Sequence, residues 1–89
     1  EAFERVEEHL AAVEVRKGSV WTNKTLEELD LAAKMGVDVI AIRRNKDLIV
    51  NPEENEMINE GDIVTVRGAP MGVHEFERLA ERTQQTSKS

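Results

Sequence analysis

An apolar, β-branched segment that ends in two arginines constrains the fold of this chain more than any other feature. Residues 37–45 read VDVIAIRRN. Valine and isoleucine suit a pleated, buried surface, and a nearly continuous apolar run predicts a strand covered on both faces. Strict alternation places two sets of side chains on opposite sides: Val37, Val39, Ala41 and Arg43 on one, and Asp38, Ile40, Ile42 and Arg44 on the other. We therefore expect a central strand whose arginines serve different faces at the rim of a sheet.

The size and charge of the chain limit its partners. A chain of 89 residues buries only about 60–65% of its unfolded surface, and its only aromatic residues are Phe3, Trp21 and Phe76. A second copy would add to this thin core, so we expect a homodimer. The formal net charge of −6 argues against nucleic acid, because neutralising phosphates requires a clustered basic surface. No stretch has a polar face basic enough for an anionic membrane surface, and we expect no direct membrane insertion.

The residue types that are missing exclude several kinds of site. The sequence contains no cysteine, which excludes disulfides, thiolate nucleophiles and cysteine-type zinc sites. No apolar run approaches the ~20 residues of a membrane-spanning helix. The first residue is Glu1 rather than methionine, so we expect this sequence to be a piece of a longer protein.

Periodicity and turn residues predict the order of the elements. Thr25 and Glu28 have the spacing of a capping box, Gly36 has the place of a left-handed helix end, and Pro70 suits a first helical position. If the first two strands are neighbours, the helix between them makes them parallel, and the small sheet is then mixed. The predicted order is a connector helix at 1–9, a strand at 10–15, one helix of about ten residues from 25 to 36, strands at 37–45, 48–50 and 63–67, a helix from 70 to about 80, and a flexible tail at 84–89.

Four motifs stand in order with matching gaps: NKTLEEL from Asn23, GVDVIAIRR from Gly36, Asn51-Pro52, and INEGDIVTVRG from Ile58. This pattern resembles the TrkA C-terminal domain, also called the RCK C-lobe, of potassium channel and transporter regulators. The resemblance implies a two-layer α+β module of order βαβββα over residues 10–83, dimeric and cytoplasmic, associated with the membrane through its parent or partner transporter. It also implies a regulatory role, in which the module senses a small ligand for an attached ion channel or transporter.

The two arginines of the central strand are the leading candidates for ligand binding. A guanidinium group holds phosphate or carboxylate oxygens through paired hydrogen bonds, although exposed arginines that merely pair with nearby glutamates are about as common. Some members of the resembled family bind a cyclic dinucleotide at the dimer interface, with the end of this strand and the following hairpin. Carried over to this chain, the candidate ligand-binding residues are Ile40, Arg43, Arg44, Asn45, Asp47 and Asn51.

A divalent cation is the other candidate ligand, because Glu53, Glu54 and Glu56 supply oxygen atoms of the kind that calcium and magnesium prefer. Their spacing fits no EF-hand loop, and a solvated acidic loop is the simpler interpretation, so we assign no metal ligands. No serine, histidine and aspartate stand in a catalytic arrangement, and we expect no enzymatic activity. The competing hypothesis is a metabolite-sensing or purely dimerising domain attached to a metabolic enzyme, since many small α+β modules share this element order.

Overall fold

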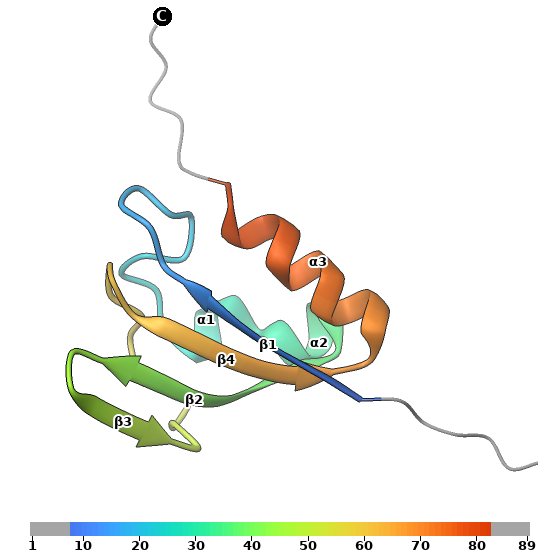
Figure 1. Ribbon diagram of the computed structural model, residues 1–89, viewed down its shortest axis with the longest axis horizontal. Coiled ribbons are helices and arrows are strands. Elements are labelled where there is room, and N and C mark those ends of the chain that lie inside the picture. Colours follow the sequence, from blue (N-terminus) through green and yellow to red (C-terminus); the bar gives the residue numbers. More distant parts are fainter. Residues whose placement is uncertain (1–7, 83–89) are drawn as a thin grey trace, which may run out of the picture.

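The computed structural model of the protein describes residues 8–82 and consists of a four-stranded sheet with three helices (Figure 1). The strands lie in the spatial order β1-β4-β2-β3, and every neighbouring pair is antiparallel. In chain order the elements are β1 (His9–Glu14), α1 (Leu26–Leu29), α2 (Leu31–Met35), β2 (Val37–Arg44), β3 (Asp47–Val50), β4 (Ile63–Gly68) and α3 (Pro70–Ala80).

The predicted α+β class and the βαβββα order are confirmed, while the expectation of a mixed sheet is wrong. The strand β4 lies between β1 and β2, so these two strands are not neighbours and the condition for a parallel pair is not met. Each instead pairs antiparallel with β4. Because β4 inserts between β1 and β2, these two strands do not form the parallel pair that a connection through a helix would allow.

A β-bulge in the middle of β2 changes which side chains point to the core. The register of β2 against β4 shifts between Val39 and Ala41, which leaves Ile40 as the extra residue. Val39 lies opposite Val66 and Ile42 lies opposite Val64, so both face the core although they are three positions apart. Strict alternation along this strand, as predicted from the sequence, is therefore wrong beyond Val39.

The expected single helix after Thr25 is two short helices. The capping box is confirmed: the Glu28 amide donates to Thr25 Oγ1 at 3.1 Å, and the Thr25 amide donates to Glu28 Oε1 at 2.8 Å. Asp30 then adopts a left-handed conformation with φ 47°, which separates α1 from α2. Leu29 and Leu31 are both buried, and since two positions on a continuous helix point about 200° apart, the break lets both leucines reach the core.

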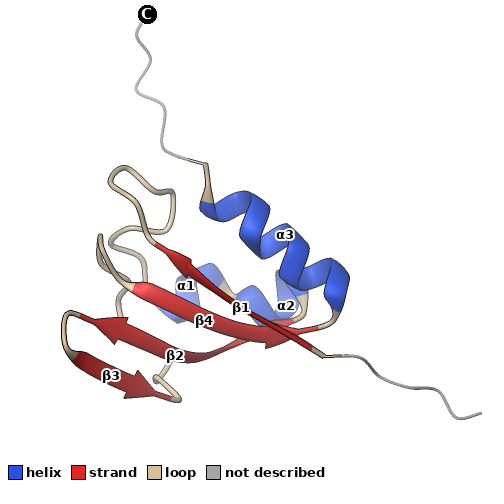
Figure 2. Cartoon of the chain, viewed as in Figure 1, coloured by secondary structure: helices blue, strands red, loops and turns tan. Residues whose placement is uncertain are grey.

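All three helices lie on one side of the sheet and enclose the core (Figure 2). Ile42, Val64 and Val66 are fully buried beneath them, whereas Ile40 at the bulge is only half-buried. Trp21 is buried and stacks on Phe76 with ring centroids 4.6 Å apart. Within residues 8–82, no helix or strand covers the opposite side of the sheet.

Two glycines permit close packing where the helices meet the sheet. A Cβ atom on Gly72 of α3 would collide with the backbone carbonyl oxygen of Met35 at the end of α2. A Cβ atom on Gly68 at the end of β4 would lie 2.7 Å from the carbonyl oxygen of Gly36. Gly36 itself is left-handed with φ 72°, as predicted for the helix end. This junction fixes how α2 and α3 sit on the core side of the sheet.

The predicted connector helix at residues 1–9 and the tail at 84–89 lie largely outside the described residues. At the end of the first of these segments, His9 already belongs to β1 rather than to a helix.

Candidate functional site

The end of β2 carries the two candidate arginines, and Arg44 is bound within the fold. Arg44 Nε donates to Asp62 Oδ1 at 3.0 Å and Nη2 donates to Asp62 Oδ2 at 2.9 Å. Nη1 donates to Glu56 Oε2 at 3.0 Å, and Nη2 also donates to the Met57 carbonyl at 2.8 Å. These contacts occupy the planar donor fork that would otherwise be available to an anion.

Asp62 is the buried partner in this ion pair, with its side chain only 1% exposed. Its Oδ2 also accepts a hydrogen bond from the Asn59 amide at 2.9 Å, so the carboxylate fixes the turn before β4 as well as Arg44. The hydrogen bond to Asp62, opposed by burial and supported by Glu56, raises the pKa of Arg44 above its ordinary value. Arg44 is therefore a fixed cation that ties the end of β2 to the loop between β3 and β4.

Arg43 presents its side chain to the opposite side of the sheet and is exposed. It lies between Ile63 of β4 and Leu48 of β3 in the register of the sheet. Among residues 8–82 it makes no side-chain hydrogen bond or ion pair. Of the two arginines, Arg43 is thus the one whose guanidinium group remains free for a ligand.

The other four candidate residues divide between the two ends of the β2–β3 hairpin. Asn45, which is left-handed with φ 59°, and Asp47 lie at the turn next to the arginines. Ile40 and Asn51 lie at the far end, where the Asn51 amide donates to the Ile40 carbonyl at 2.9 Å. Four strand positions separate the two groups, about 13 Å at ~3.3 Å per residue. In one protomer the six residues therefore form two groups and not a single pocket.

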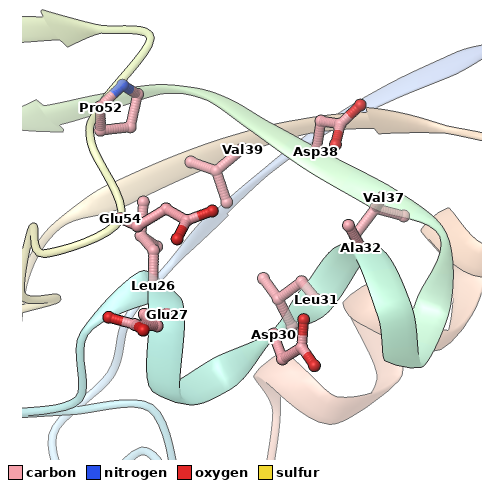
Figure 3. A pocket seen from close by; sticks show the side chains of 10 residues that line it. All are labelled: Leu26, Glu27, Asp30, Leu31, Ala32, Val37, Asp38, Val39, Pro52 and Glu54. Carbon is pink, nitrogen blue, oxygen red and sulfur yellow. The ribbon is translucent and has the colours of Figure 1, made fainter.

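A groove of about 230 Å³ borders the far group of candidates (Figure 3). Val39 of β2 and Pro52 line it, and these are sequence neighbours of Ile40 and Asn51. The helices α1 and α2 form its other wall with Leu26 and Leu31. Sequence reasoning missed this groove, because its walls come together only through the packing of α1 and α2 beside β2.

Four carboxylates line the groove, which disfavours anions there. They come from α1, the break before α2, β2 and the loop after β3: Glu27, Asp30, Asp38 and Glu54. The acidic loop considered for metal binding is divided by the fold, since Glu56 pairs with Arg44 while Glu53 and Glu54 are exposed. Within residues 8–82, no group of three or more histidine, cysteine, aspartate or glutamate side chains is placed to hold a metal ion.

A model of the TrkA-C domain family matches residues 10–81. Among curated proteins, the chain is 37% identical over 81 residues to the Ktr system potassium uptake protein C of Bacillus subtilis, a match that covers 91% of this chain. The match covers only 36% of that relative, so the chain spans about a third of its length.

Solved structures share the fold. The C domain of the potassium transport protein KtrA, in complex with cyclic diadenosine monophosphate (c-di-AMP), is 27% identical, has a TM-score of 0.69, and is matched over 81% of this chain and 82% of that one. The RCK_C domain dimer of S. agalactiae BusR with c-di-AMP has a TM-score of 0.72 at 21% identity, covering 80% of this chain and 93% of that one. The longer BusR chain bound to promotor DNA is matched over 35% of its length. In the described part of this chain, none of the helices is long and apolar enough to cross a membrane.

Proposed function

The chain belongs to the TrkA-C domain family, and we propose that it is the ligand-sensing module of a potassium transport system, dimeric and without enzymatic activity. Its proposed place is in the cytoplasm, next to an ion channel or transporter that forms part of the same protein or a partner protein. The proposed ligand is a cyclic dinucleotide of the c-di-AMP type. The 27% identity to the KtrA domain that binds c-di-AMP supports this ligand class.

The observation that carries the proposal is the free guanidinium group of Arg43 beside the β2–β3 turn. The chain is acidic overall, with a formal net charge of −6, so an anionic ligand needs a local cation to overcome repulsion. Arg44 is already paired with Asp62 and Glu56. Arg43 is therefore the proposed phosphate contact, while Asn45 and Asp47 supply polar groups beside it.

A dimer solves the problem that one protomer offers one free arginine at this site. A two-fold axis presents Arg43 twice, and a cyclic dinucleotide has two phosphates related by its own two-fold symmetry. We propose that one ligand bridges two protomers. The second group of candidates, Ile40 and Asn51, is then available for the parts of the ligand that lie away from the phosphates.

A thermal stability screen tests the ligand class. A ligand that binds only the folded state raises the unfolding midpoint by mass action, so c-di-AMP should raise it while NAD and divalent cations at equal concentration should not. Replacing Arg43 with alanine should abolish the shift and leave the midpoint without ligand unchanged. The matched control is Lys46→Ala, which removes an exposed cation from the same turn.

Each outcome decides between functions. A shift that persists in Arg43→Ala, or that disappears equally in Lys46→Ala, would contradict Arg43 as the phosphate contact. A shift with divalent cations alone would favour a cation sensor. No shift with any nucleotide or cation would favour the alternative function, a metabolite-sensing or purely dimerising domain.

A further inference from the structure

We propose that the groove between β2 and the helices α1 and α2 is a docking site for a short cationic segment of a partner protein. The segment inserts one aliphatic side chain into the groove and places lysine or arginine side chains on either side of it. This contact is separate from the nucleotide site proposed at Arg43, and the inference therefore goes beyond the proposed function.

The floor of the groove is aliphatic. Leu31 and Val37 line it and are buried. Leu26, Val39 and Pro52 also line it but are only half-buried, so part of their apolar surface remains open to solvent. Removing this surface from water stabilises a bound aliphatic side chain in proportion to the area that is covered.

The size of the groove suits one anchoring side chain better than a whole small molecule. Its volume is about 230 Å³, whereas pockets that enclose a metabolite or cofactor ordinarily measure ~300–1,000 Å³. Anchoring side chains that fill such pockets carry much of the binding energy when a protein recognises a peptide.

Backbone hydrogen bonds join the two walls of the groove. The Leu26 amide donates to the Glu56 carbonyl at 3.0 Å, and the Glu27 amide donates to the Glu54 carbonyl at 2.9 Å. Arg44 holds the same loop through the Glu56 carboxylate. The groove is therefore formed in the protein without a partner, and binding does not have to order its walls.

The charges of the walls favour a cationic partner. Glu27 and Asp30 stand on the helical wall, and Glu54 stands on the loop after β3 (Figure 3). Within residues 8–82, these three side chains make no hydrogen bond or ion pair, and no lysine, arginine or histidine lines the groove. Ammonium or guanidinium groups beside the anchor relieve the repulsion among these carboxylates and gain charge-assisted hydrogen bonds.

The same charges argue against other occupants. A nucleotide is an anion, and a second copy of this chain carries a formal net charge of −6, so the groove repels both. A metal ion would leave the apolar floor uncovered, and in the described part of the chain no three carboxylates are placed to hold one.

Nuclear magnetic resonance of the 89-residue chain tests the groove with a pentapeptide in which two lysines flank one leucine on each side. Amide shifts should be confined to the walls and floor, at residues 26–32, 37–39 and 52–54. One matched peptide has serine in place of leucine, and another has glutamate in place of lysine. The serine peptide should bind at least ~10-fold more weakly, because it lacks the apolar anchor, and the glutamate peptide should not bind.

Two pairs of variants test the residues of the groove. Glu54→Gln should raise the dissociation constant of the leucine peptide about threefold, whereas Glu53→Gln removes the same charge one residue outside the groove and should leave it unchanged. Ala32→Phe fills the groove from an exposed position of α2 and should abolish binding. Ala33→Phe makes the same change at the next exposed position, which does not line the groove, and should have no effect.

Equal effects within either pair of variants would overturn the assignment of the groove, as would the absence of shifts at millimolar peptide. A serine peptide that binds as tightly as the leucine peptide would show only a general attraction of cations to an acidic chain. A chain that binds c-di-AMP but not the leucine peptide would contradict the groove and leave the proposed function intact. A chain that binds the peptide but no nucleotide would support the groove and contradict the proposed ligand.

Discussion

The two sides of the sheet present the same strands to different surroundings. On the helical side, Ile42, Val64 and Val66 are fully buried. On the side that no helix covers, which we call the open face, their immediate strand neighbours Arg43, Thr65 and Arg67 remain exposed or half-buried. The two adjacent arginines differ in the same way: within residues 8–82, Arg44 is bound to Asp62 and Arg43 makes no side-chain hydrogen bond or ion pair. One side of the sheet stabilises the protomer, and the other remains exposed in the part of the chain that the structure describes.

The largest expected effect is on the core side. Ile42→Ala removes a fully buried side chain beneath the helices and should lower the free energy of unfolding by ~2–5 kcal/mol. The matched change on the open face is Leu48→Ala, which should lower it by less than about 0.5 kcal/mol in the monomer. Urea unfolding at protein concentrations below the dimer dissociation constant measures the free energy of unfolding of both variants. Similar losses for the two variants would break the distinction between the sides.

The next largest effect separates the two arginines. Arg44→Ala leaves the buried Asp62 carboxylate without its cation, and loss of one partner of a buried pair costs ~3–5 kcal/mol. Because the Arg44 side chain is 26% exposed, solvent lowers this to about 2–3 kcal/mol. Arg43→Ala should change stability by less than about 0.5 kcal/mol. Chemical denaturation measures the free energy of unfolding of both variants. Equal losses would mean that Arg43 also has a structural partner.

A smaller effect is expected at the helix junction. Gly72→Ala directs a methyl group at the Met35 carbonyl on the core side and should cost ~1–3 kcal/mol through overpacking. The neighbouring change Met71→Ala, at an exposed position of the same helix, should cost less than about 0.5 kcal/mol. Thermal unfolding compares them. A neutral Gly72→Ala would show that α2 and α3 separate without penalty.

The smallest effect concerns pH. The folded-state pKa of Arg44 is raised above its unfolded value, so the stability that this shift contributes is fully present below the unfolded pKa and is lost only as pH rises through the folded pKa. Both values lie far above neutrality. The difference in unfolding free energy between the natural chain and Arg44→Gln should therefore stay constant from neutral pH to about pH 10. A steady decline over that interval would contradict a fixed cation at Arg44.

The local features of the sequence predicted much of this fold. The capping box at Thr25, the left-handed Gly36 and the start of α3 at Pro70 depend on a few neighbouring residues, and all three are confirmed. The bulge at Ile40 and the break at Asp30 were missed. Both let two side chains reach the same core, and that demand arises only when distant elements pack.

The same limit applies to the site. The sequence pointed to the end of β2, but the choice between its two arginines depends on Asp62, which lies 18 residues away from Arg44. Residue types alone could not separate a structural arginine from a free one. The insertion of β4 between β1 and β2, which creates the open face, is likewise a property of the assembled sheet.

Calorimetric titration of c-di-AMP into the 89-residue chain tests the central claim most directly. If Arg43 forms one symmetric site across two copies, binding should saturate at about one half ligand per chain. The same titration should show no measurable heat of binding with Arg43→Ala and an unchanged stoichiometry with Lys46→Ala. Saturation at one ligand per chain, or full binding by Arg43→Ala, would contradict a site shared between two copies at Arg43 and place recognition elsewhere on the protomer.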